Sequence, residues 1–71
     1  MRYAVVIEWS DGNYSAYVPD LPGCVSTGQT VDEVRANMGE AIGFHLDGLR
    51  QDGQPIPAAS SQVDYVEPKV A

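Results

Sequence analysis

The sequence predicts a small α+β fold in which one helix packs on one face of an antiparallel sheet, in the element order β-β-β-α-β. Two observations support this fold class. Strand-like runs flank an Asp11-Gly12 turn signal, and a long segment after Thr30 repeats its apolar residues at helical spacing. Because the chain has only 71 residues, we expect one domain over residues 1–71.

The first two strands are expected over residues 3–9 and 13–18. Residues 3–9 are rich in β-branched and aromatic side chains and contain neither Gly nor Pro. A loop at Asp11 and Gly12 favours a two-residue type I′ hairpin, because both positions of that turn need a positive φ.

The register of this hairpin decides which side chains share a face of the sheet. It pairs three sets of apolar residues across the strands: Trp9 with Tyr14, Ile7 with Ala16, and Val5 with Val18. Alternation places Val6, Glu8 and Tyr17 on the opposite face, which is half apolar and half polar and is suited to contact with solvent or another protein.

A rigid turn, a third strand and the helix follow in that order. Residues 19–23 hold two prolines and a glycine and predict the turn, and residues 24–28 predict a short strand. Thr30 and Glu33 have the spacing of a capping box, so we expect the helix over residues 31–51.

The helix has an apolar stripe that we expect to cover the apolar face of the hairpin. Its members recur every three or four residues: Val31, Val34, Met38, Ala41, Ile42, His45 and Leu49. Gly53 and Pro55 end the helix, and an extended connector then leads to residues 62–67, whose alternation predicts a last strand.

The charge balance restricts the class of partner. Four Lys and Arg against ten Asp and Glu give a formal net charge of −6. Nucleic-acid binders need clustered cations, so this balance argues against DNA or RNA and favours a basic protein.

Composition also restricts compartment and assembly. The single Cys24 permits no internal disulfide, which favours a reducing cytosol, and no apolar run approaches the about 18 residues of a membrane span. We therefore expect a soluble, cytoplasmic protein without a signal peptide. A core this small is often stabilised by self-association, so we also expect a homo-oligomer, a dimer or a tetramer.

Few residues have the surroundings that catalysis needs. His45 lies on the apolar stripe without a nucleophile motif, and Cys24 lacks a neighbouring cation to lower its pKa. Glu8, Asp11 and Asp20 are the one set that suggests a metal-dependent nuclease, but they are not expected to converge on one ion. We predict no enzyme activity, no catalytic or metal site and no cofactor.

Phe44 falls about 120° from the centre of the apolar stripe of the helix. It is either a lone exposed aromatic or part of an interface. Together with Val6 on the outer sheet face, it is our candidate for the oligomer interface.

Most of the chain resembles the HicB-like antitoxin domain. The resemblance rests on the opening strand of the type Tyr-x-Val-Val-Ile-Glu, the acidic Gly-containing hairpin, and four further motifs: Tyr14-Ser15-Ala16-Tyr17-Val18, Pro19-Asp20-Leu21-Pro22-Gly23-Cys24, Thr27-Gly28-Gln29-Thr30-Val31-Asp32-Glu33 and Gly53-Gln54-Pro55-Ile56-Pro57. It implies a partly degraded RNase H-like fold and an antitoxin that masks HicA, a small basic RNase that cleaves mRNA. Many such proteins also carry a DNA-binding segment, which we do not find before Ala71, so direct DNA binding is not expected.

The face of the sheet on which each side chain is expected to lie then indicates a candidate contact surface for the basic toxin. It combines the outer hairpin face with the loop after it: Glu8, Tyr17, Asp20 and Leu21. Tyr17 is the expected anchor, and Glu8 and Asp20 are the charged rim. The alternative is an orphan, self-associating structural or regulatory domain without a toxin partner.

Overall fold

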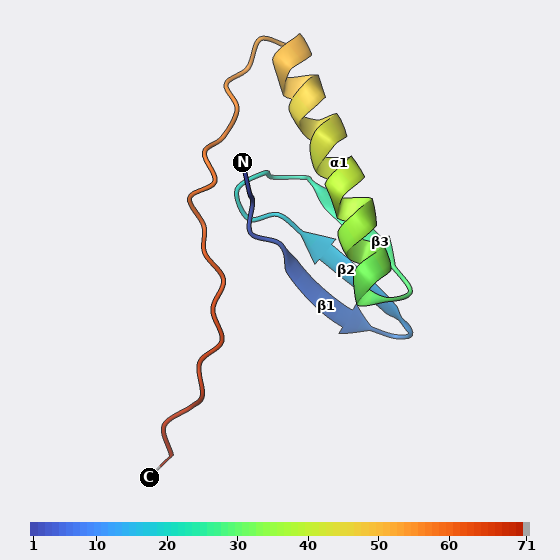
Figure 1. Cartoon of the computed structure of the whole chain (residues 1–71), viewed down its shortest axis with the longest axis vertical. Coiled ribbons are helices and arrows are strands. Elements are labelled where there is room, and N and C mark those ends of the chain that lie inside the picture. Colours follow the sequence, from blue (N-terminus) through green and yellow to red (C-terminus); the bar gives the residue numbers. More distant parts are fainter. Residues whose placement is uncertain (71) are drawn as a thin grey trace.

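The computed structural model describes residues 1–70 and contains a three-stranded sheet and one long helix (Figure 1). The elements are β1 (Val6–Ser10), β2 (Asn13–Tyr17), β3 (Val25–Gly28) and α1 (Val31–Gln51). The sheet is antiparallel in the order β1-β2-β3, with α1 on one face. The predicted α+β class and the order β-β-β-α are confirmed.

The β1–β2 hairpin turns at Asp11 and Gly12, as the sequence predicts. Both residues have positive φ, 48° and 80°, which is the backbone that a type I′ turn requires. The predicted pairs Trp9 with Tyr14 and Ile7 with Ala16 are confirmed. The regular strand begins at Val6, three residues later than expected.

α1 begins and ends where its capping signals predict. The Glu33 amide donates to Thr30 Oγ1 at 3.0 Å, so Thr30 is the N-cap. At the other end the Gly53 amide donates to the Arg50 carbonyl at 3.1 Å, and the Gln54 amide donates to the Leu49 carbonyl at 2.9 Å. These bonds satisfy carbonyls that the last helical turn leaves without a partner.

The start of α1 lies directly against the end of β3. A Cβ built on Gly28 would stand 2.7 Å from the Val34 backbone nitrogen and 3.0 Å from its Cα. Asn37 Nδ2 also donates to the Thr27 carbonyl at 2.9 Å. Gly28 is therefore the residue that lets the helix backbone approach the sheet.

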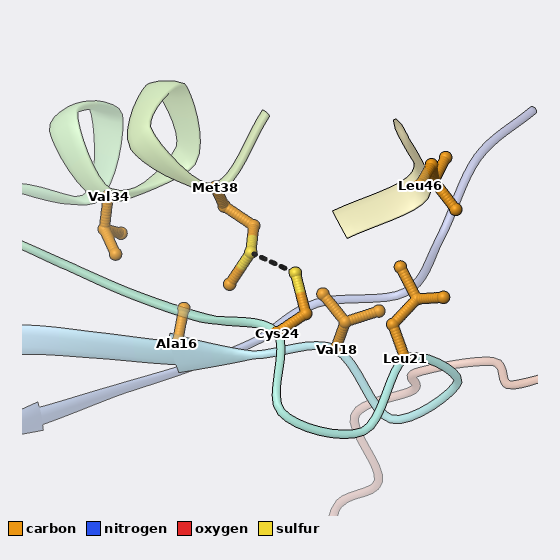
Figure 2. Close-up of a cluster of buried hydrophobic side chains, with 7 residues drawn as sticks. All are labelled: Ala16, Val18, Leu21, Cys24, Val34, Met38 and Leu46. Carbon is orange, nitrogen blue, oxygen red and sulfur yellow. Dashed lines mark hydrogen bonds between the residues drawn. The ribbon is translucent and has the colours of Figure 1, made fainter. Parts of the chain in front are cut away.

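The core lies between α1 and the sheet (Figure 2). Its buried members are Ala16, Val18, Leu21, Cys24, Val34, Met38 and Leu46. Val34 and Met38 point from the helix toward Ala16 and Cys24, and the Cys24 thiol lies 4.0 Å from the Met38 sulfur. Leu46 was absent from the predicted stripe, whereas Val31, which was in it, is 41% exposed.

α1 rests mainly on β2 and β3 and covers β1 only in part. Trp9 was expected under the helix, but it is 59% exposed and contacts the Tyr14 ring edge to face at 4.8 Å between centroids. A groove of about 320 Å³ remains between β1 and the helix, with Ile7 and Met38 among the residues that line it.

The last predicted strand, residues 62–67, is not formed in this structure. The chain after Gly53 runs back on the β1 side of the sheet and continues past it (Figure 1). The alternation of apolar and polar residues makes residues 62–67 suitable for a strand, but a strand forms only where a neighbouring strand offers its backbone for hydrogen bonding. Residues 61–63 lie beside residues 2–5, ahead of β1, and the rest of the segment leaves the sheet.

Candidate functional site

The sheet face opposite α1 carries an apolar row that crosses all three strands. Val6 pairs with Tyr17, and Tyr17 pairs with Val25 in the register of the sheet. Because directly paired residues point to the same side, the three side chains form one row. Tyr17 is 45% exposed and Val25 is 65% exposed, so this outer row, Val6–Tyr17–Val25, is accessible.

A polar row lies next to the outer row. Glu8 pairs with Ser15, and Ser15 pairs with Thr27. Glu8 is exposed and supplies the only charge of this row. The outer face thus presents a tyrosine between two valines with a carboxylate one step away, an arrangement suited to a partner with an apolar centre and a cationic rim.

Further carboxylates lie at the end of the molecule where the hairpin turns. β3 ends at Gly28, which pairs with Tyr14 near that turn, and α1 begins three residues later. Asp32 and Glu33 in the first helical turn therefore lie at the same end of the sheet as Asp11 (Figure 1).

Asp20, predicted as a rim residue, holds the C-terminal segment. Its carboxylate accepts hydrogen bonds from the Ser61 amide at 2.9 Å, the Ser61 hydroxyl at 2.7 Å and the Ser60 hydroxyl at 3.2 Å. These donors, led by the Ser61 amide, hold the pKa of Asp20 below its ordinary value of 3.8, because they stabilise the ionised carboxylate. Much of its acceptor capacity is thus used within the chain.

Leu21 was predicted as a partner contact, and this prediction is wrong for the structure. The side chain is fully buried, with 0% exposure, beside Val18 in the core (Figure 2). The loop folds inward because the Leu21 amide donates to the Val18 carbonyl at 3.1 Å and the Cys24 amide donates to the Leu21 carbonyl at 3.0 Å. Leu21 therefore stabilises the core and offers no surface to a partner.

The two residues predicted for the oligomer interface do not form one patch. Val6 lies on the outer sheet face, whereas Phe44 is on α1, which covers the other face. Phe44 is 78% exposed beside Gly43, flanked by the carboxylates of Glu40 and Asp47. The chain thus has an exposed aromatic on each of two opposite sides.

The acidic residues considered for a metal site stay apart. Glu8 points from the outer face, Asp11 lies in the hairpin turn, and Asp20 bonds the C-terminal segment. Among residues 1–70 no three His, Cys, Asp or Glu side chains are grouped as a metal ion would require.

Cys24 and His45 occupy positions consistent with structural roles. Cys24 is 4% exposed, and burial raises the pKa of its thiol, which disfavours the reactive thiolate. His45 is partly buried on α1.

Val25 is the surface residue that the sequence reasoning missed. The signal was present, because the third strand alternates and its pairing with the second would have placed Val25 beside Tyr17. The sequence does not determine the register between β2 and β3, because the loop that joins them is long. A two-residue turn, in contrast, fixes the register of its hairpin.

Comparison with known proteins identifies similar chains. The model of the family described as HicB-like antitoxin of bacterial toxin-antitoxin system matches residues 3–70. Among solved structures, a chain of a HicA3 and HicB3 toxin-antitoxin complex is 31% identical, with a TM-score of 0.70 over 87% of this chain and 70% of that one.

Curated relatives come from a phage and from an archaeon, among others. An uncharacterized 14.9 kDa protein of Haemophilus phage HP1 is 38% identical over 93% of this chain, which spans 50% of the phage protein's length. A UPF0150 protein of Thermoplasma acidophilum is 36% identical over 87% of this chain and 91% of its own length. The one helix among residues 1–70, α1, is not long and apolar enough to cross a membrane.

Proposed function

The chain belongs to the HicB-like antitoxin family, and on that premise we propose that it binds a small basic HicA-type toxin and covers the surface with which the toxin holds RNA. The observation that carries the proposal is the uncovered outer row Val6–Tyr17–Val25 with Glu8 beside it. The likeness to a chain of a HicA3 and HicB3 complex supports a toxin of the HicA kind.

Tyr17 is the anchor of the proposed contact. Its ring stands in the middle of the outer row and leaves 45% of its surface to solvent. Interface hot spots are enriched in tyrosine near the centre of a contact, where a polar rim excludes water around them. Val6 and Val25 on either side extend the apolar centre.

Charge supplies attraction over a longer range. The net charge of −6 and the carboxylates of Glu8, Asp11, Asp32 and Glu33 at the hairpin end complement the Lys and Arg with which a ribonuclease binds phosphates. Such complementarity raises the association rate and weakens with added salt. Inhibition is then steric and electrostatic and needs no bond-forming step.

The proposal is tested by RNA protection. A small basic HicA-type protein, sought first in the reading frames adjacent to this chain's gene, is assayed for mRNA cleavage with increasing amounts of the chain. We expect cleavage to stop near equimolar amounts and Tyr17→Ala to weaken inhibition by about 10- to 100-fold, corresponding to about 1.4–2.8 kcal/mol.

Phe44→Ala is the matched control, because it removes an exposed aromatic ring from the opposite side of the molecule. It should change inhibition less than about twofold, as expected for a residue outside the contact. Unimpeded cleavage with the wild-type chain in excess contradicts the proposal and favours the alternative of a self-associating domain without a toxin. Equal inhibition by the Tyr17→Ala and Phe44→Ala variants would show that the outer face is not the toxin-binding surface.

A further inference from the structure

The segment after α1 has the composition of a strand but lacks a partner in its own chain. Val63 is 46% exposed, Tyr65 is 94% exposed and Val66 is 85% exposed. Within the described chain, residues 62–70 make no backbone–backbone hydrogen bond. The Tyr65 amide donates to the neighbouring Asp64 carboxylate at 2.7 Å. Three large apolar side chains on an extended backbone that pairs with no strand among residues 1–70 form a segment suited to pair with a sheet edge.

β1 provides such an edge. It is an edge strand of the sheet β1-β2-β3, so one side of its backbone has no neighbouring strand among residues 1–70. The groove between β1 and α1 adjoins it and is lined by Tyr3, Val5, Ile7, Arg35, Met38, Gly39 and Ile42. An added strand would cover apolar surface there that α1 leaves partly open.

The chain's own C-terminal segment is held where it does not reach this edge. Tyr3 Oη donates to the Pro57 carbonyl at 2.6 Å, and Asp20 holds Ser61 as described above. Residues 61–63 consequently lie beside residues 2–5, which precede β1. Beyond them the segment points away from the sheet (Figure 1).

We propose that residues 62–67 pair with the free edge of β1 in a second copy of this chain, and that the second copy returns the same contact. Two identical contacts related by a two-fold axis close the exchange, so each C-terminal segment and each β1 edge has one partner. This inference is independent of toxin binding and rests on the structure of the chain alone.

The chemistry of the segment fits the groove. In an extended strand Val63, Tyr65 and Glu67 point to one face, because side chains alternate. That face meets a groove whose apolar residues are accompanied by one cation, Arg35. Val66 points to the other face, on the side where Val6 begins the outer row. One face of the added strand therefore matches the groove in polarity, and the other face matches the outer row.

The size of the core gives a reason for the exchange. Seven buried side chains make up the core, and chains of this length bury a smaller fraction of their unfolded surface on folding than larger domains do. Exchange of an existing segment adds apolar burial without any new element of sequence.

The test uses full-length variants and light scattering after size exclusion. The wild-type chain should have twice the monomer mass of 7.6 kDa. The double variant Tyr65→Pro/Val66→Pro should have the monomer mass, because adjacent residues point their amides in opposite directions and one of them must donate to β1. Both side chains are largely exposed, so α1 should keep its circular dichroism signal.

The matched control is Lys69→Pro/Val70→Pro, which places the same two prolines outside residues 62–67 and should leave the mass at twice the monomer value. A monomeric wild-type chain overturns the proposal, as does a dimer that persists in the Tyr65→Pro/Val66→Pro variant.

Isotope-filtered NOE spectra of mixed labelled and unlabelled protein separate exchange from pairing within one chain. Contacts between residues 62–67 and β1 should appear between a labelled and an unlabelled copy. Contacts confined to one copy would show that the segment completes its own sheet, and this also overturns the proposal.

Discussion

Gly28→Ala should destabilise this protein although it adds only one methyl group. The new Cβ would stand 2.7 Å from the Val34 backbone nitrogen, 3.0 Å from its Cα and 3.2 Å from the Glu33 carbonyl carbon. All three are backbone atoms of the first helical turn, so relief requires α1 to move away from β3. Overpacking of this kind costs about 1–3 kcal/mol, which exceeds the about 0.4–1 kcal/mol that alanine gains by restricting the unfolded chain.

Gly43→Ala on α1 is the matched control, since it makes the same chemical change away from β3 and outside the groove between β1 and α1. A Cβ at Gly43 meets no atom within 4 Å, and alanine is the better helix former by about 1 kcal/mol. Urea unfolding followed by the circular dichroism of α1, at one fixed protein concentration, should show opposite shifts for the two variants. A Gly28→Ala protein as stable as the wild type would refute the close approach of α1 to β3.

Three further outcomes follow from the buried and hydrogen-bonded groups. Leu21→Ala should lower the free energy of unfolding by about 2–5 kcal/mol in urea titrations, as for a core leucine; a change under about 0.5 kcal/mol would place Leu21 on the surface. Because burial raises the pKa of Cys24, its thiol should react with DTNB slowly in the folded chain and rapidly in urea, and equal rates would contradict its burial. The pKa of Asp20 is lowered in the folded chain, so its hold on Ser61 should be complete above pH 3.8 and lost as the pH falls through the lower folded-state value. Carbon-detected NMR titration of the carboxyl group checks this, and an Asp20 pKa above 3.8 would contradict the hydrogen bonds.

The parts of the fold that sequence reasoning predicted are those fixed by local chemistry. Asp11 and Gly12 determine the first hairpin register through their own backbone preferences. Thr30 determines the start of α1 because its hydroxyl accepts from an amide only three residues away. These signals lie within a few residues of the structure that they specify.

The parts that were missed depend on contacts distant in sequence. Leu21 is buried because its loop folds back beneath α1, which turn residues alone do not encode. Residues 62–67 alternate as a strand does, but the pattern does not say which backbone they pair with. Asp20 has its carboxylate engaged by serines about 40 residues later, and no local pattern connects them.

The same division applies to the candidate site. Strand alternation placed Glu8 and Tyr17 on the outer face, and the register confirms their positions there. Their role in binding a toxin is a proposal supported by the family and by their exposure. Val25 entered only when the pairing of β2 with β3 was known.

We propose above that the outer sheet face binds a basic toxin. Amide chemical-shift mapping examines this contact residue by residue, with the isotope-labelled chain titrated with a small basic HicA-type protein. We expect the largest shifts at Val6, Tyr17 and Val25, and we expect these shifts to diminish as salt is added. Shifts confined to the exposed face of α1 around Phe44, or no shifts at an excess of the toxin, would contradict it.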